Sequence, residues 1–331
     1  MDHTNGNYTS ALRTPTGIAA DPALTAHGVD QARELGERLV AADPPIERVY
    51  SSLYYRCLQT IEPFMRRKAE EATSASTPVL AERSSGENRD VYPRLRVRGE
   101  TGLGEWYGSA PFEHPVPATV DVLESHFPAL LDHAYKPAVV PTRMGESVDE
   151  LHNRVAATME ALIAECDRDG IRAVLLCSHA AVVIALGRVL TGLMPENIEV
   201  EDFRAFTCGL SVYRRRGSNK QSISGEGQGK SGDGKRTTAA SLDESSHDKP
   251  GAQQKSYSLR PGMENAVGVG SDSGGATKPR AADACNADLK INPCSTRDVS
   301  QWRGGRGVAG GWDCELNSDC AHLSGGEERG W

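Results

Sequence analysis

The sequence predicts a three-layer α/β/α sandwich built on a mostly parallel sheet. Short strands that are apolar throughout alternate with amphipathic helices, which is the pattern of a parallel sheet covered on both faces. The residues that form a core also stop early: all five phenylalanines precede residue 207, and only one of nine tyrosines, Tyr257, follows Tyr213. We therefore expect one folded domain and a long polar tract within the 331 residues.

The helices are predicted from apolar residues that recur at helical spacing. Thr25 stands where an N-cap residue is needed, and Asp169 with Gly170 stops the clearest helix. Pro128 lies inside the third helical pattern without ending it. The expected helices cover residues 29–40, 55–64, 119–133, 148–166 and 180–190.

The strands are predicted from short apolar runs, and they set the expected domain organisation. These runs are residues 46–50, 78–81, 173–177, 210–215 and 312–316, while the polar residues 84–98 are expected to form an irregular loop. We expect one domain over residues 1–216 and a disordered insertion rich in glycine and serine over 217–306. Residues 307–331 would add a C-terminal strand and tail to the same domain.

Charge and hydropathy argue against several functional classes. Thirty-seven basic and 45 acidic residues give a net charge of −8, so no global positive field would recruit nucleic acid or anionic lipid. The longest strongly apolar run, residues 180–186, is shorter than the ~20 residues of a bilayer span. The first ten residues have neither the basic region nor the apolar core of a secretory signal. We expect a soluble, cytoplasmic or nuclear protein without direct nucleic-acid or membrane contacts.

The eight cysteines are expected to be reduced thiols rather than a disulfide framework. The last four have spacings that match no common zinc pattern, so neither a metal nor another cofactor is expected; they are Cys285, Cys294, Cys314 and Cys320. Three consecutive arginines at residues 214–216, with Lys220, form either a weak nuclear signal or a solvated basic edge.

Arg56 and His179 are candidate phosphate-binding residues because each follows an apolar strand. Arg56 lies in the first turn of a helix, where backbone N–H groups and the helix dipole favour an anion, and its guanidinium can hold phosphate with two hydrogen bonds. His179 stands at the carboxyl end of a second strand, where open α/β sheets place their ligand crevice. The alternatives are an ordinary surface arginine and a histidine satisfied by a backbone carbonyl.

Glu105 is the candidate acid. Its segment, GLGEWYG at residues 102–108, combines glycines that permit close approach with aromatic residues that can desolvate the carboxyl group. Desolvation raises the pKa of a carboxyl group and suits it to donate a proton to a leaving oxygen. The alternative is an exposed loop glutamate beside a core tryptophan.

Four motifs resemble those of the histidine phosphatase superfamily, also called the phosphoglycerate mutase-like family. They occur in the family's order within residues 1 to about 216 and are LTAHGVDQA (24–32), SSLYYRCLQT (51–60), GES (145–147) and CSHA (177–180). The GLGEWYG segment, with WDCELNSDC (312–320) and SGGEER (324–329), resembles a fungal branch that includes a subunit of the RNA polymerase III transcription factor TFIIIC. That second resemblance implies subunits of a transcription complex as partners.

The superfamily resemblance implies phosphoryl transfer without a metal, on a phosphorylated small molecule or a phosphoprotein. A histidine attacks phosphorus and forms a phosphohistidine, which water then hydrolyses. Arg56 would be a phosphate-binding arginine and His179 the second histidine that neutralises the phosphate oxygens. Glu105 would protonate the departing alcohol.

The main departure from the family concerns the nucleophile. The family carries it in an Arg-His-Gly motif that ends the first strand, upstream of the Leu-Thr segment, and this sequence contains no Arg-His-Gly. His3, between Asp2 and Thr4, follows no apolar strand. We therefore expect the usual first strand to be absent and catalysis to be absent or impaired. The sequence is then either a truncated or mispredicted product or a non-catalytic relative.

Two functions remain open on the sequence. The first is a histidine phosphatase-like protein whose phosphate pocket survives without its nucleophile. The second is a non-catalytic interaction subunit of a nuclear transcription complex. Turnover of a phosphomonoester would favour the first, whereas co-purification with nuclear partners and no turnover would favour the second.

Overall fold

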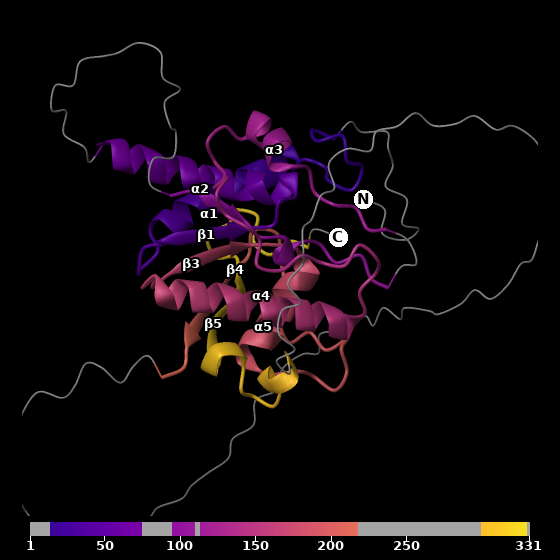
Figure 1. Cartoon of the computed structure of the whole chain (residues 1–331). Coiled ribbons are helices and arrows are strands. Elements are labelled where there is room, and N and C mark those ends of the chain that lie inside the picture. The colour runs from indigo at the N-terminus through magenta and orange to yellow at the C-terminus, as the bar shows by residue number, and fades with distance from the viewer. Residues whose placement is uncertain (1–13, 75–94, 110–112, 218–298, 330–331) are drawn as a thin grey trace, which may run out of the picture. The chain divides into compact units, whose positions relative to one another are not determined.

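The computed structural model describes residues 14–74, 95–109, 113–217 and 299–329 (Figure 1). The chain divides into two units, residues 1–222 with 295–331, and residues 223–294. All the described residues belong to the first unit. None of the described helices is both long enough and apolar enough to span a bilayer.

The centre of this unit is a three-stranded parallel sheet in the order β2-β1-β3. Strand β1 (Arg48–Ser51) pairs with β2 (Val97–Gly99) on one side and β3 (Val174–Cys177) on the other. Val49 and Tyr50 of the central strand are completely buried, as expected for a strand covered on both faces. The prediction that segments 46–50 and 173–177 form parallel strands of one sheet is confirmed.

Helices cover both faces of this sheet (Figure 1). They are α1 (Ala26–Val40), α2 (Tyr55–Ser74), α3 (Val120–His126), α4 (Val148–Arg168) and α5 (Ala180–Thr191). Neighbouring residues of β1 point to opposite faces. Val49 joins the apolar cluster of α1, α2 and α3, whereas Tyr50 joins the cluster of α4 and α5. The predicted three-layer α/β/α arrangement is confirmed.

The helix starts and stops follow their local signals. The Thr25 side chain caps α1 by accepting a hydrogen bond from the backbone N–H of Gly28. Helix α4 begins with a capping box formed by Ser147 and Glu150. It ends just before Gly170, whose φ of 69° a helix cannot continue through, so the predicted stop is confirmed.

Helix α3 is shorter than expected. The pattern predicted a helix over residues 119–133, but α3 ends at His126. Pro128 has no N–H to donate to the preceding turn, and Ala129 adopts a φ of 60°. The apolar residues after this break are still buried, because Leu130 and Leu131 lie beside β2. Apolar periodicity therefore continued past the end of the helix.

A second sheet consists of two antiparallel strands, β4 (Leu210–Arg215) and β5 (Trp312–Asp319). The strands expected at residues 210–215 and 312–316 are confirmed, and β5 extends three residues further. Within the described residues β3 pairs only with β1 and β4 only with β5, so each presents one edge without a strand partner. The described residues also contain three short 3₁₀ helices: η1 (Thr101–Leu103), η2 (Val299–Trp302) and η3 (Val308–Gly310).

Two expectations about loops need correction. Residues 84–98 were expected to be irregular, but residues 97–99 form β2, because they pair with the buried strand β1 although they are only three residues long. Residues 299–306 of the expected disordered tract include η2, where Trp302 is only 2% exposed. The remainder of that tract from residue 218, and the strand expected at 78–81, lie outside the described residues.

Candidate functional site

Arg56, Glu105 and His179 meet at the carboxyl end of the parallel sheet. Ser51 lies opposite Cys177 in the pairing of β1 with β3, so both strands end at the same edge, and α2 and α5 begin directly after it. Arg56 Nη2 lies 2.8 Å from Glu105 Oε2 and 3.1 Å from His179 Nδ1. Glu105 Oε2 also lies 3.1 Å from His179 Nδ1. The structure thus places all three sequence-predicted residues in one cluster.

Arg56 is held by the loop that precedes α1. The Asp21 carboxylate is completely buried and accepts hydrogen bonds from the backbone N–H of Tyr55, so it caps α2. Arg56 Nη1 donates to the carbonyl of Ala20 at 3.1 Å, and its guanidinium lies 4.8 Å from the centre of the Tyr54 ring. Burial raises the pKa of Asp21, although the Tyr55 N–H and the Arg56 charge oppose that change. Asp21 could not be identified from its local sequence, because the helix it caps begins 34 residues later.

His179 is oriented by residues of the turn between β1 and α2. Its Nε2 lies 2.9 Å from Ser52 Oγ, and its ring contacts the Tyr54 ring edge-on at 5.2 Å between centroids. The imidazole is buried, with 3% of the side chain exposed. Ser52 and Tyr54 belong to the SSLYYRCLQT motif, but their place in the site was not predicted from the sequence.

The pKa of the Glu105 carboxyl group is lower than the surrounding sequence predicted. Burial opposes its ionisation, but the charge and hydrogen bond of His179 and the charge of Arg56 outweigh burial and lower its pKa to about 2. Desolvation raises this pKa as expected, but the two cations reverse the net direction. Two cations from distant segments reach the carboxylate, and local sequence does not reveal them.

His179 carries the complementary charge. Burial opposes a charged imidazole, but the charges of Cys57 and Glu105 and their hydrogen bonds raise its pKa to about 9. The imidazolium then donates from Nδ1 to Glu105 and from Nε2 to Ser52. Arg56 Nη2 and His179 Nδ1 are consequently two donors that share one acceptor, Glu105. The cluster presents two cations and one carboxylate.

The Cys57 thiol contacts the His179 ring of this cluster. Its Sγ is 3.6 Å from His179 Nε2, and the side chain is buried. A hydrogen bond from Cys177 lowers its pKa, burial opposes that change, and the nearby charges of His179 and Arg56 lower it further. Within the described residues no group of three histidine, cysteine or acidic side chains is placed to hold a metal ion.

The ion pair predicts a pH window for stability. The stabilisation from Glu105, whose pKa falls from 4.5 to about 2, is complete above pH 4.5 and is lost as pH falls through 2. The stabilisation from His179, whose pKa rises from 6.5 to about 9, is complete below pH 6.5 and is lost as pH rises through 9. We expect the contribution of this single pair to the free energy of unfolding to be largest between these limits. Urea unfolding of the parent chain and of His179→Gln across this range tests it; an equally large alkaline loss in the variant would contradict the assignment.

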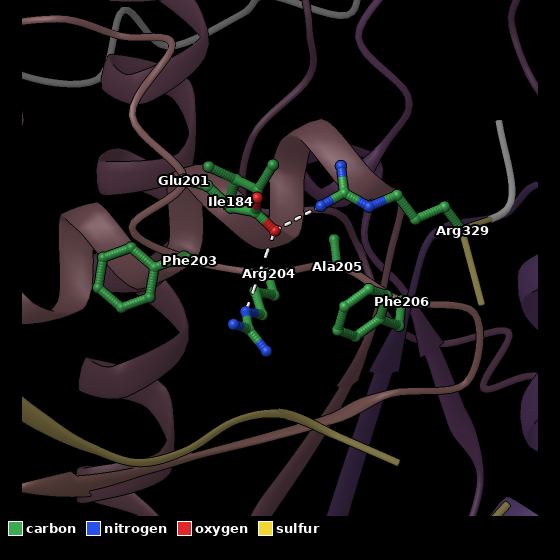
Figure 2. A pocket seen from close by; sticks show the side chains of 7 residues that line it. All are labelled: Ile184, Glu201, Phe203, Arg204, Ala205, Phe206 and Arg329. Atoms are coloured by element: carbon green, nitrogen blue, oxygen red, sulfur yellow. Dashed lines mark hydrogen bonds and ion pairs between the residues drawn. The ribbon is translucent and has the colours of Figure 1, made fainter. Parts of the chain in front are cut away.

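A separate surface pocket contains none of these three residues (Figure 2). Glu201 forms an ion pair with Arg329 and lies 4.0 Å from Arg204, while the ring of Phe206 contacts both guanidinium groups. Glu327 also lies 3.6 Å from Arg204, so two carboxylates offset the two arginines and would repel an anion. This pocket therefore suits a phosphate less well than the cluster at the sheet edge does. Its lining is Ile184, Glu201, Phe203, Arg204, Ala205, Phe206 and Arg329.

Known proteins resemble this chain over somewhat more than half of its length. The chain is 30% identical over 207 residues to the transcription factor tau 55 kDa subunit of Saccharomyces cerevisiae, covering 60% of this chain and 41% of that protein. It is 29% identical over 187 residues to the ecdysteroid-phosphate phosphatase of Drosophila melanogaster, covering 56% of this chain and 22% of that protein. The chain thus spans less than half the length of these relatives.

The solved structure of the ecdysone phosphate phosphatase from Bombyx mori in complex with tungstate is 23% identical and covers 56% of this chain and 62% of that one, with a TM-score of 0.40. The family model of the histidine phosphatase superfamily (branch 1) matches residues 6–106 and 93–224. These two segments together include Arg56, Glu105 and His179 and extend over more than half of the sequence. The chain therefore belongs to branch 1 of the histidine phosphatase superfamily.

Proposed function

We propose that this chain binds phosphate esters at the cluster of Arg56, Glu105 and His179, and that it hydrolyses them slowly or not at all. The convergence of Arg56, which is 17% exposed, and the buried His179 on one carboxylate oxygen carries the binding proposal. A tetrahedral phosphate offers several oxygens where Glu105 offers one, so it can accept from both cations at once. The site also lies at the carboxyl edge of the sheet, where α/β folds bind ligands.

Phosphate binding would change the protonation of Glu105. In the free pocket the two cations keep this carboxyl group ionised. A phosphate dianion that takes the hydrogen bonds of Arg56 and His179 adds a like charge beside Glu105, which raises its pKa. The carboxyl group then takes up a proton and is placed to donate it to a leaving oxygen.

The weak-turnover proposal rests on the missing nucleophile. The superfamily mechanism requires a histidine in Arg-His-Gly, a motif that the sequence lacks. Ser52 Oγ and Cys57 Sγ lie 2.9 and 3.6 Å from His179 Nε2, whereas Arg56 and Glu105 contact Nδ1, where the phosphate is proposed to bind, so neither side chain is placed as its nucleophile. General acid catalysis by Glu105, worth ~10²- to 10⁴-fold in rate, does not replace covalent attack.

A vanadate titration beside a phosphatase assay tests this proposal. We expect saturable vanadate binding by the parent chain and no binding by His179→Ala. Turnover of p-nitrophenyl phosphate by the parent should not exceed that of the variant. Far-UV circular dichroism establishes that both chains are folded. Turnover that is substantial in the parent and abolished in His179→Ala would contradict the proposal, because chemistry would then depend on this pocket without an Arg-His-Gly histidine.

A second function is favoured by the similarity to the yeast tau 55 kDa subunit. We propose that the chain also serves as a nuclear interaction subunit, with transcription-complex subunits as its partners. Affinity purification of the tagged chain from nuclear extract of its own organism should recover TFIIIC subunits in stoichiometric amounts. Recovery of the chain alone at physiological salt would contradict this proposal and leave phosphate binding unaffected.

A further inference from the structure

We infer that Arg154, paired with Glu146, is a positioning residue that holds Glu105 against Arg56 and His179. This inference rests on the proposed function of the phosphate pocket. Arg154 lies on α4 and does not touch the three clustered side chains. It acts on the backbone of the loop that carries Glu105.

The Arg154 guanidinium uses both of its edges. Nε and Nη2 donate to the two carboxylate oxygens of Glu146 at 2.9–3.0 Å, which is a bidentate ion pair. The remaining nitrogen, Nη1, donates to the carbonyl of Gly102 at 2.8 Å and to that of Gly104 at 3.0 Å. The two side chains of the ion pair are only 4% and 6% exposed. The carbonyl just before Glu105 is therefore bound to a buried, immobile donor.

Further contacts hold the loop on both sides of Glu105. Ser178 Oγ donates to the carbonyl of Leu103 at 2.7 Å, so three consecutive carbonyls before Glu105 have fixed donors. After Glu105, the Trp106 indole N–H donates to the carbonyl of Glu146 at 2.9 Å, and the backbone N–H of Glu146 donates to Gly108. Glu146 thus anchors the loop twice through its backbone and once through Arg154.

Close packing leaves this loop little room to adjust. A Cβ atom at Gly102 would lie 2.2 Å from Thr158 Oγ1, so the loop backbone rests directly on α4. Thr158 is itself hydrogen-bonded to the carbonyl of Arg154 one turn earlier. Because the backbone is fixed up to Gly104, the side chain of Glu105 begins from a fixed point and reaches the two cations.

The energetics of buried ion pairs also favour a positioning role. Burial removes both charges from water, and this desolvation costs about as much free energy as their mutual attraction provides. Such a pair therefore contributes little net stability compared with apolar residues of similar size. What it supplies is a defined geometry, and only the planar fork of arginine can hold a carboxylate and two carbonyls at once. Lysine keeps the charge at this position but concentrates its donors on one nitrogen.

The protein contains a matched control for this arrangement. Arg188 on α5 is also buried, with 4% of its side chain exposed, and it forms a bidentate pair with Asp202 at 2.9–3.2 Å. Its Nη2 donates to the carbonyl of Ile198 at 3.2 Å. Arg188→Lys therefore removes an equivalent bidentate pair. The loop that Arg188 contacts contains none of the three clustered residues.

The test compares Arg154→Lys with Arg188→Lys by carbon-13 NMR titration of the Glu105 carboxyl group, assigned with Glu105→Gln. We expect the pKa of Glu105 to stay at about 2 in the parent and in Arg188→Lys, and to move toward 4.5 in Arg154→Lys. Equal titration of Glu105 in the two lysine variants would overturn the inference. Thermal unfolding of both variants measures the structural loss that they share.

A milder variant covers the case in which Arg154→Lys does not fold. Trp106→Phe keeps an aromatic ring but removes the indole hydrogen bond to Glu146. The pKa of Glu105 should then rise by a smaller amount, and an unchanged value would overturn the inference in that case. Failure of the parent chain to bind vanadate would contradict the proposed function instead, since the Glu105 titration is measured without ligand.

Discussion

Replacing Arg56 by alanine is expected to weaken vanadate and phosphate binding about 100-fold, the usual range for losing one member of a buried charged hydrogen-bonded pair. The guanidinium supplies the only fixed positive charge of the cluster, because His179 loses its charge above pH 9. Its loss also leaves the Glu105 carboxylate to repel the incoming anion. Isothermal titration of vanadate into the parent and the variant measures the effect.

The control for this measurement is Arg48, which lies at the end of β1 opposite the cluster. Arg48 begins β1, is 12% exposed and forms an ion pair with Asp169 at 2.9 Å. Arg48→Ala should therefore disturb the same structural unit without altering anion affinity, while Arg56→Lys should fall between parent and alanine because it keeps charge but not the fork. Equal losses from Arg48→Ala and Arg56→Ala would show that the effect is on folding and not on the pocket.

Glu105→Gln is expected to have the opposite effect, raising affinity for a dianion about tenfold at pH 7. The carboxylate is ionised at this pH and competes with the ligand for the hydrogen bonds of Arg56 and His179. A dianion that binds the parent either lies beside the charged Glu105 carboxylate or binds together with a proton. The affinity of the parent should therefore increase as pH falls. Glutamine removes both costs, so near pH 7 the variant should bind the dianion more tightly than the parent does.

Sulfate is the probe for this second measurement because it remains a dianion from pH 5 to 8. Calorimetry in two buffers of different ionisation enthalpy should reveal proton uptake on binding to the parent and none with Glu105→Gln. Glu113→Gln is the control, since Glu113 is an exposed loop glutamate paired with Arg143. Lower affinity in Glu105→Gln than in Glu113→Gln would mean that Glu105 binds the ligand rather than competes with it.

The sequence predicted those site residues whose role is indicated by their immediate neighbours along the chain. Arg56 and His179 were identifiable because each follows an apolar strand and begins or precedes a helix, and the parallel pairing of β1 with β3 brings them together. Strand β2 was missed because it is only three residues long and its burial comes from β1.

Interactions between distant segments were the main source of error. The pKa of Glu105 was predicted in the wrong direction because Arg56 and His179 approach it from two other segments. Arg154 was not singled out at all, since it lies 52 residues from the Gly102 carbonyl that it binds. Arg154 occupies a regular helix position with no unusual neighbours in sequence, so the sequence around it did not indicate that contact.

Strand β5 determines how this domain must be produced in isolation. The family match stops at residue 224, yet the partner of β4 begins at Trp312, and Trp302 and Val308 are buried beside α4 and α5. A recombinant fragment cut at the end of the match would lose a strand and part of its core. A recombinant domain must therefore retain residues 299–329 in addition to the matched segment.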